Sequence, residues 1–135
     1  MKEPVWIDGR DVLALHSRLL ALDGGAEGVR DAGLLESALA RPRQVRAYRS
    51  KAGAIKISTS YTSALVRIDL FVDGNKRTGF LVGVLFLELN GYRFIAAEED
   101  ATQAVLGLAA GTMDEAAFAA WMRGHVKRKW RVAGG

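Results

Sequence analysis

Residues 73–78 of the chain, DGNKRT, are nearly all polar and stand directly before a long uncharged run. Gly74 lets the backbone bend into a nest of N–H groups, because a glycine has no Cβ in the way. If a helix begins here, its first turn offers further unpaired N–H groups and the positive end of the helix dipole, which suit an anion. Asn75 adds a side-chain donor, and Lys76 and Arg77 add two cations. These residue types in this order predict a binding site for the phosphates of a nucleotide.

Asp73 is the one acidic member of this stretch. Its carboxylate would repel a bare phosphate, but it is well placed to hold Mg²⁺ on a polyphosphate. A structural interpretation is also consistent with these residues: Asp73 caps the next helix in an Asp-Gly turn, and Lys76 and Arg77 lie on the surface. The sequence contains no GxxxxGK[ST] motif, and no GxGxxG motif after a strand. The residues alone therefore leave both interpretations open.

The elements that position these residues are predicted to be helices, because apolar residues recur at helical spacing along the chain. Asp8 is expected to cap the first helix, which ends at Gly24 and Gly25. Asp31 is expected to cap a second helix, which must stop before Pro42 because the residue preceding a proline avoids the α region. The apolar face expected for the first helix consists of Val12, Leu15, Leu19 and Leu22.

The helix expected at about 75–89 is apolar on nearly every side, which is typical of a helix at the centre of a bundle. Gly79 and Gly83 would let a neighbouring backbone come close to it. Other helices are expected at 54–66, near 98–109 and after Thr112, where TMDE forms a capping box with Thr112 at the cap. Residues 91–96, GYRFIA, are compatible with a short strand or hairpin. The predicted architecture is a compact all-α bundle around the helix at 75–89, with the polar stretch at its N-terminus.

Length and composition are those of an ordinary globular chain. Its 135 residues are expected to form a single domain, 1–135. There is no cysteine, no apolar signal core at the N-terminus and no apolar run near the roughly 20 residues that a bilayer needs. We therefore expect a cytoplasmic protein that does not cross a membrane. The net charge of +4 comes largely from 41–51 and 125–131, which either attract nucleic acid, an acidic protein tail or a phosphorylated ligand, or form a solvated face.

Residues 69–80, DLFVDGNKRTGF, resemble the core motif of the Fic/Doc family, His-x-Phe-x-[Asp/Glu]-Gly-Asn-[Gly/Lys]-Arg-Thr, at every fixed position except the first. Residues 24–42 also resemble the Doc-type ("death on curing") toxins of this family, as do the later stretches LFLELNGY and GLAAGTMDEAAFAAWM. The likeness extends over about 8–125, and its motif is long and fixed in order. It implies the all-α fold that the periodicity predicts.

Lys76 is the feature shared with Doc-type members, whereas Fic-type members carry glycine there and transfer AMP to a protein hydroxyl. In Doc-type members the bound nucleotide is reversed and the γ-phosphoryl group is transferred. The resemblance therefore implies an ATP-dependent protein kinase with ATP and Mg²⁺ as its ligands. Doc toxins phosphorylate elongation factor Tu on a threonine and halt translation, which makes this factor the implied target.

The resemblance also implies roles for individual residues. Asp73 would hold Mg²⁺, and Phe71 would pack the motif onto the core. The implied nucleotide-binding residues are Arg67, Gly74, Asn75, Lys76 and Arg77, and the implied catalytic residues are Asp69, Asp73 and Lys76. Phosphoryl transfer is mostly positioning and charge stabilisation, so this set is chemically sufficient except for its base.

The base is the departure from the family, because Asp69 holds the place of the family's histidine. An aspartate titrates near pH 4 against roughly 6.5 for histidine, so we expect an inactive or weakened enzyme. His16 and His125 are remote in sequence and are expected on helix faces. Three interpretations of Asp69 stay open: a substitution introduced to permit expression, a natural change in a degraded or altered member, and an active base, as aspartate is in protein kinases.

The leading interpretation is a toxin of a type II toxin–antitoxin pair. The alternatives are a Fic-type AMP transferase, against which Lys76 argues, and a pseudoenzyme that only binds an antitoxin. The sequence lacks the [Ser/Thr]-x-x-x-Glu-[Gly/Asn] helix that inhibits some Fic proteins from within, so an inhibitor is expected in trans. The implied antitoxin has a disordered, acidic C-terminal segment that folds as a helix in a basic groove. Direct binding to nucleic acid is not expected.

Overall fold

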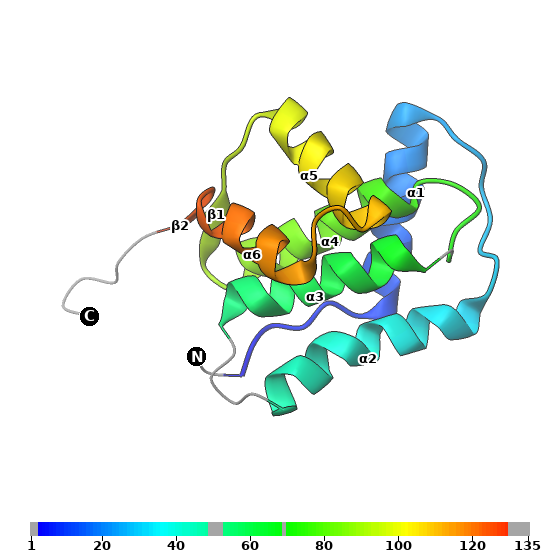
Figure 1. Ribbon diagram of the computed structural model, residues 1–135. Coiled ribbons are helices and arrows are strands. Elements are labelled where there is room, and N and C mark those ends of the chain that lie inside the picture. Colours follow the sequence, from blue (N-terminus) through cyan, green and yellow to red (C-terminus); the bar gives the residue numbers. More distant parts are fainter. Residues whose placement is uncertain (1–2, 49–52, 69, 130–135) are drawn as a thin grey trace.

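The structure is a computed structural model that describes residues 3–48, 53–68 and 70–129. Its elements are α1 (Gly9–Asp23), α2 (Ala32–Tyr48), α3 (Ala54–Arg67), α4 (Asn75–Leu89), β1 (Tyr92–Phe94), α5 (Glu98–Ala110), α6 (Glu115–Arg123) and β2 (Val126–Arg128). The all-α prediction is confirmed, with one small two-stranded sheet among the described residues. α3 and α4 lie in the middle, with α2 below and α5 above (Figure 1). No helix in these ranges has the length and apolar character that a membrane span requires.

Hydroxyl groups and glycines join the two central helices. Thr62 Oγ1 donates to the Gly79 carbonyl at 2.9 Å, and Ser58 Oγ donates to the Gly83 carbonyl at 2.8 Å. A Cβ on Gly79 would lie 2.8 Å from a methyl group of Val66, and one on Gly83 would collide with Thr62. The predicted close approach at these two glycines is therefore confirmed.

α3 is enclosed as completely as the helix that was predicted to be central. Residues 57–63 are all buried, although five of them are serine or threonine. A buried hydroxyl is tolerated when it donates to a backbone carbonyl, as Ser60 does to Ile57 at 2.7 Å. In the same run the Tyr61 hydroxyl accepts from Ile7 N at 3.0 Å, and burial raises the pKa of Tyr61. The bundle therefore surrounds the α3–α4 pair rather than α4 alone.

The first two helices differ from prediction in one feature each. Asp8 caps α1 as expected, but the buried face is Val12, His16 and Leu20, while Leu22 is exposed. Asp31 accepts from Gly33 N at 2.9 Å at the start of α2, as expected of a cap. The expected stop before Pro42 is wrong, because α2 continues to Tyr48 with Pro42 buried inside it. Its packing against α3 offsets the lost hydrogen bond of the proline.

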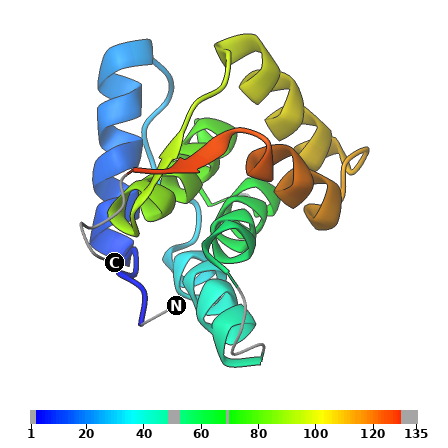
Figure 2. The same cartoon turned by 90° about the vertical axis from the view of Figure 1, so that its left-hand side faces the viewer.

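The C-terminal part also corrects one cap. α6 is capped by Asp114, which accepts from Ala117 N at 2.8 Å, and the predicted cap at Thr112 is wrong. Thr112 Oγ1 instead donates to the Gly107 carbonyl at 3.3 Å and closes the turn after α5. The strand left open at 91–96 forms as β1, which pairs antiparallel with β2 (Figure 2).

Candidate active site

The polar motif lies on a short connection between α3 and α4. We call residues 70–74 the motif loop. Leu70 and Phe71 are 0 % and 1 % exposed, so their side chains anchor the loop in the core, as predicted for Phe71. Val72 and Asp73, which follow them, are exposed. The loop is thus fixed at its first half and presents its second half to solvent.

Asn75 fastens this loop with its side chain. Its Oδ1 accepts from Phe71 N and its Nδ2 donates to the Phe71 carbonyl, both at 2.9 Å. A primary amide can bind both the N–H and the C=O group of one residue in this way because it carries both an acceptor and a donor. The Asn75 carboxamide, which was predicted to bind a nucleotide, therefore binds the motif loop and stabilises its conformation.

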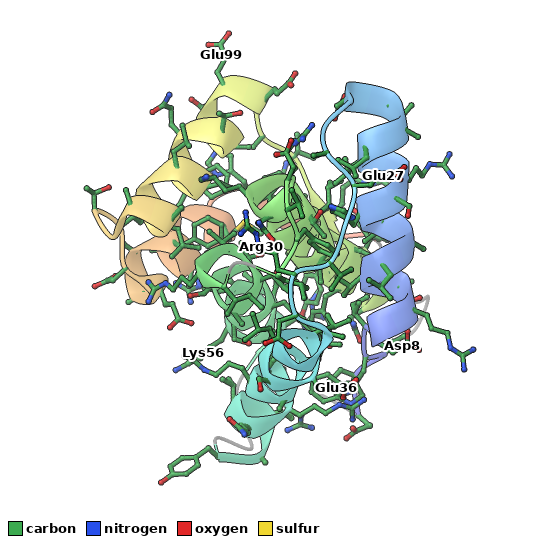
Figure 3. The ribbon with its side chains drawn as sticks, turned by 90° about the vertical axis from the view of Figure 1, so that its right-hand side faces the viewer. Asp8, Glu27, Arg30, Glu36, Lys56 and Glu99 are labelled. Atoms are coloured by element: carbon green, nitrogen blue, oxygen red, sulfur yellow. The ribbon has the colours of Figure 1, made fainter. Side chains whose placement is uncertain are left out.

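A segment at 24–30, which we call the cover segment, pairs with the motif loop on its other side. Arg30 N donates to the Leu70 carbonyl at 2.7 Å, and Val72 N donates to the Gly28 carbonyl at 3.0 Å. The cover segment is the light-blue connection in Figure 3 that runs from α1 to α2 and carries Glu27 and Arg30. The loop is therefore held by neighbours on two sides before α4 begins.

α4 begins without a side-chain cap from the described residues. Its N-cap residue is Gly74, with φ +84°, a conformation that other residues rarely adopt. The first bond of the helix runs from Thr78 N to the Gly74 carbonyl at 3.0 Å, so the N–H groups of Lys76 and Arg77 precede the helical ladder. Asp73 accepts from Gly74 N at 2.8 Å and does not cap the helix. The alternative in which Asp73 serves as the helix cap is thus wrong.

A groove of about 520 Å³ opens beside this turn, between α1, α4 and α5. Figure 2 shows α1 on the left and α5 on the right of the bundle. The described lining comprises residues 73–77, together with Leu19, Asp23, Phe80, Leu81, Glu98, Ala101, Thr102, Val105 and Leu106. The groove therefore has a polar end at the motif and an apolar wall further along.

The predicted basic character of the groove is not observed. Its described lining carries two cations, Lys76 and Arg77, against the three carboxylates of Asp23, Asp73 and Glu98. Arg77 Nη1 lies 3.2 Å from Asp23 Oδ2, and about half of each side chain is exposed. An exposed pair of this kind contributes about 1 kcal/mol or less, so a phosphate can replace Asp23 as the partner of Arg77. The positive charge is concentrated at the motif end alone.

The donor set fits Mg²⁺ that arrives on a nucleotide. Asp73 is exposed at the groove, and its Oδ1 and Oδ2 accept from Gly74 N at 2.8 Å and Ala26 N at 3.4 Å, which leaves lone pairs for a cation. No three His, Asp or Glu side chains of the described ranges are grouped closely enough to hold a metal ion. Mg²⁺ is commonly bound by one or two carboxylates together with substrate phosphates, and a single carboxylate meets that need.

The structure brings most of the predicted site residues together. Residues 73–77 all line the groove. Arg67 is exposed at the end of α3, and the described lining of the groove does not include it. Asp69 lies outside the described residues, so its place at the site remains a prediction. His125 lies in the turn after α6 rather than on a helix face.

Two residues at the site were missed from sequence. Asp23 was not singled out from the sequence, although it pairs with Arg77. His16 was assigned to a helix face, and it is buried against the motif loop. The available signal was its spacing of four from Val12 and Leu20, which places it on the buried stripe.

Comparison with known proteins identifies the family of the chain. Residues 6–87 match the model of the Fic/DOC family. The chain is 31% identical over 117 residues to a protein of Escherichia phage P1 named "Protein kinase doc", covering 87% of this chain and 92% of that protein. It is 39% identical over 106 residues to "Toxin Doc" of Mycolicibacterium smegmatis, covering 73% and 74% of the two chains. The chain therefore belongs to the Fic/Doc family, and these relatives are Doc proteins.

Proposed function

We propose that the chain is a Doc-type toxin of a type II toxin–antitoxin system, acting as an ATP-dependent protein kinase. The observation that carries the proposal is the uncapped start of α4, which opens onto a groove beside Lys76 and Asp73. Family membership and the name of the phage relative support the same activity. The lysine at position 76 favours the kinase over a Fic-type AMP transferase, which carries glycine there.

In this proposal the phosphates of ATP lie against the first turn of α4. The N–H groups of Lys76 and Arg77 and their two cationic side chains bind phosphate oxygens, with Arg77 released from Asp23. Asp73 holds Mg²⁺, which neutralises charge on the phosphates when bound. An acceptor hydroxyl oxygen then bonds to the γ-phosphorus while the bond from that phosphorus to the bridging oxygen breaks. ADP leaves, and the hydroxyl proton passes to the group at position 69.

The biological setting proposed is cytoplasmic. Elongation factor Tu is the proposed protein target, and its phosphorylation would stop translation. An antitoxin with a disordered, acidic C-terminal segment is the proposed inhibitor. Asp69 favours one second candidate, a pseudoenzyme that retains the groove and binds only the antitoxin. The two candidates differ in whether the groove still binds ATP.

We expect ATP to bind roughly tenfold more tightly with Mg²⁺ than with EDTA, because the ion adds a charge-assisted contact to Asp73. Asp73→Asn should remove this difference, while its amide oxygen can still accept from Gly74 N. Titration calorimetry on the purified chain measures both. Glu99→Gln is the matched control, since Glu99 projects into solvent from α5 (Figure 3) and does not line the groove. An Mg²⁺ effect that persists in Asp73→Asn contradicts the assigned metal ligand, and absence of ATP binding supports the pseudoenzyme.

The groove should also bind the acidic C-terminal segment of the protein encoded by the adjacent gene. An amphipathic helix would place apolar side chains on the wall formed by Phe80, Leu81 and Val105, and an acidic side chain near Arg77. Calorimetry should give exothermic binding with a negative ΔCp, because disordered chain folds and apolar area is buried. A peptide with glutamine in place of the acidic residue near Arg77 is the control and should bind more weakly, because the positive charge of the groove is concentrated at that end. If the native peptide shows no binding at tens of micromolar, the toxin–antitoxin assignment loses its main support.

A further inference from the structure

His16 is a buried histidine that no step of the proposed reaction uses. It belongs to α1, is 5 % exposed, and lies against three residues of the motif loop. Its ring stacks on Phe71, with 3.5 Å between ring centroids and 4° between the planes. Its Nε2 lies 2.7 Å from the Asp73 carbonyl oxygen. The ring also lies behind Gly74, where an added Cβ would be 3.5 Å from Cδ2 and Nε2.

The chemistry of the contact fixes where the ring carries its proton. A carbonyl oxygen only accepts, so Nε2 must carry hydrogen and donate to Asp73. This donor is present both in the neutral Nε2–H tautomer and in the imidazolium ion, so the bond does not depend on the charge of the ring. Burying an imidazole is costly unless it is hydrogen-bonded, and a leucine or phenylalanine would fill an apolar site without that cost. The Nε2–H group of the buried His16 is therefore satisfied by its hydrogen bond to the Asp73 carbonyl.

This hydrogen bond orients the peptide unit between Asp73 and Gly74. In a planar trans peptide the C=O and N–H groups point in opposite directions. Holding the Asp73 oxygen toward α1 therefore holds the Gly74 N–H away from α1, where it donates to Asp73 Oδ1 at 2.8 Å. Glycine populates both signs of φ, so this peptide would otherwise have freedom to rotate at Gly74. One contact thus sets the direction of the N–H group and of the carboxylate that it binds.

We propose that His16 is a positioning residue for the anion site. It locks the Asp73–Gly74 peptide and, through that peptide, the Gly74 N–H group and the Asp73 carboxylate that this N–H binds and that would hold Mg²⁺. The inference rests on the proposed nucleotide binding. It gives a residue of α1, outside the sequence motif, a role in ligand binding.

Three variants test the role through the dissociation constant of Mg·ATP, measured by calorimetry alongside the midpoint of thermal unfolding. His16→Phe keeps the stacked ring but loses the donor, and should weaken binding roughly tenfold, equivalent to about 1.4 kcal/mol. His16→Gln replaces Nε2 with an amide N–H and should recover most of the affinity. His125→Phe is the matched control. His125 also has a ring nitrogen near a backbone carbonyl, Trp121 O at 2.8 Å, and a neighbouring aromatic ring, but it does not line the groove.

Two outcomes overturn the proposal: His16→Phe binds Mg·ATP as the unchanged chain does, or His16→Gln loses as much affinity as His16→Phe. A further readout needs no variant, because ¹⁵N shifts of the imidazole in the unchanged chain report its tautomer. They should show hydrogen on Nε2, and a ring with hydrogen on Nδ1 alone contradicts the bond to Asp73. If the unchanged chain binds no Mg·ATP, the proposed function fails, while the tautomer still decides whether the contact exists.

Discussion

Replacing Asp69 with histidine is expected to raise the rate of phosphoryl transfer by about 10²–10⁴-fold, the range that a positioned general base contributes. The family motif has histidine at this place, and an imidazole is a far better base near neutral pH than a carboxylate with a pKa near 4. The remaining motif residues are present, and the structure brings residues 73–77 together at one groove. The variant should therefore need no other change. In vitro transfer rates and growth after induction in a bacterial host measure the effect.

Two further variants test whether the change in activity comes from the base at position 69 or from the phosphate contacts around it. Asp69→Asn has nearly the size of aspartate without its basicity, so it should be no more active than the unchanged chain. Asp69→His combined with Arg77→Ala lacks a proposed phosphate contact and should arrest growth far less than Asp69→His alone. Equal and strong toxicity of the unchanged chain and of Asp69→His would show that Asp69 is itself a competent base.

Local signals in the sequence were enough to predict the helices around the motif. Asp8 and Gly24 mark the ends of α1, and α4 runs over 75–89 as its apolar pattern predicted. The predicted end of α2 before Pro42 was wrong. The residue before a proline avoids the α region only as a local preference, and the packing of α2 against α3 overrides that preference. The bundle was predicted to surround the helix at 75–89 alone, whereas α3 is also central, because Ser58, Ser60 and Thr62 are buried with their hydroxyl groups donating to backbone carbonyls. Both errors arise where tertiary contacts outweigh local preference.

The site was predictable where its residues are adjacent in the chain. Gly74, Lys76 and Arg77 share one turn, so their types and order were sufficient to place them together. His16 and Asp23 were not predictable in this way, because only the packing of α1 beside the start of α4 brings them to the motif. The function of Asn75 could not be predicted from the sequence either, since a carboxamide can bind a ligand or the backbone of a nearby residue equally well.

Lys76 is expected to decide which phosphorus atom of ATP is attacked. A hydroxyl can attack the α-phosphorus and release pyrophosphate, or the γ-phosphorus and release ADP. The end of the nucleotide that lies in line with the acceptor determines the outcome. In the Asp69→His background, label from γ-³²P-ATP should pass to elongation factor Tu or another bacterial protein. Label from α-³²P-ATP should not.

The structural reason lies at the first turn of α4. Lys76 follows Gly74 by two residues and lines the groove, so its side chain takes space beside the N–H groups that bind phosphate. A lysine there leaves less room for two phosphates in the nest and adds a charge that one phosphate can meet. Lys76→Gly should therefore reduce γ-transfer by roughly ten- to a hundredfold, the loss expected for one charge-assisted contact, and should restore some AMP transfer.

Lys56→Ala controls for the loss of one positive charge, because Lys56 is exposed on α3 and does not line the groove (Figure 3). It should leave both transfers unchanged. Transfer of the α-label while Lys76 is present would contradict the kinase assignment and favour the AMP transferase. Loss of γ-transfer in Lys76→Gly without any α-transfer would mean that the lysine binds phosphate but does not select the pose. The orientation of the nucleotide would then depend on the rest of the groove, whose described lining includes the carboxylates of Asp23 and Glu98, which repel phosphates.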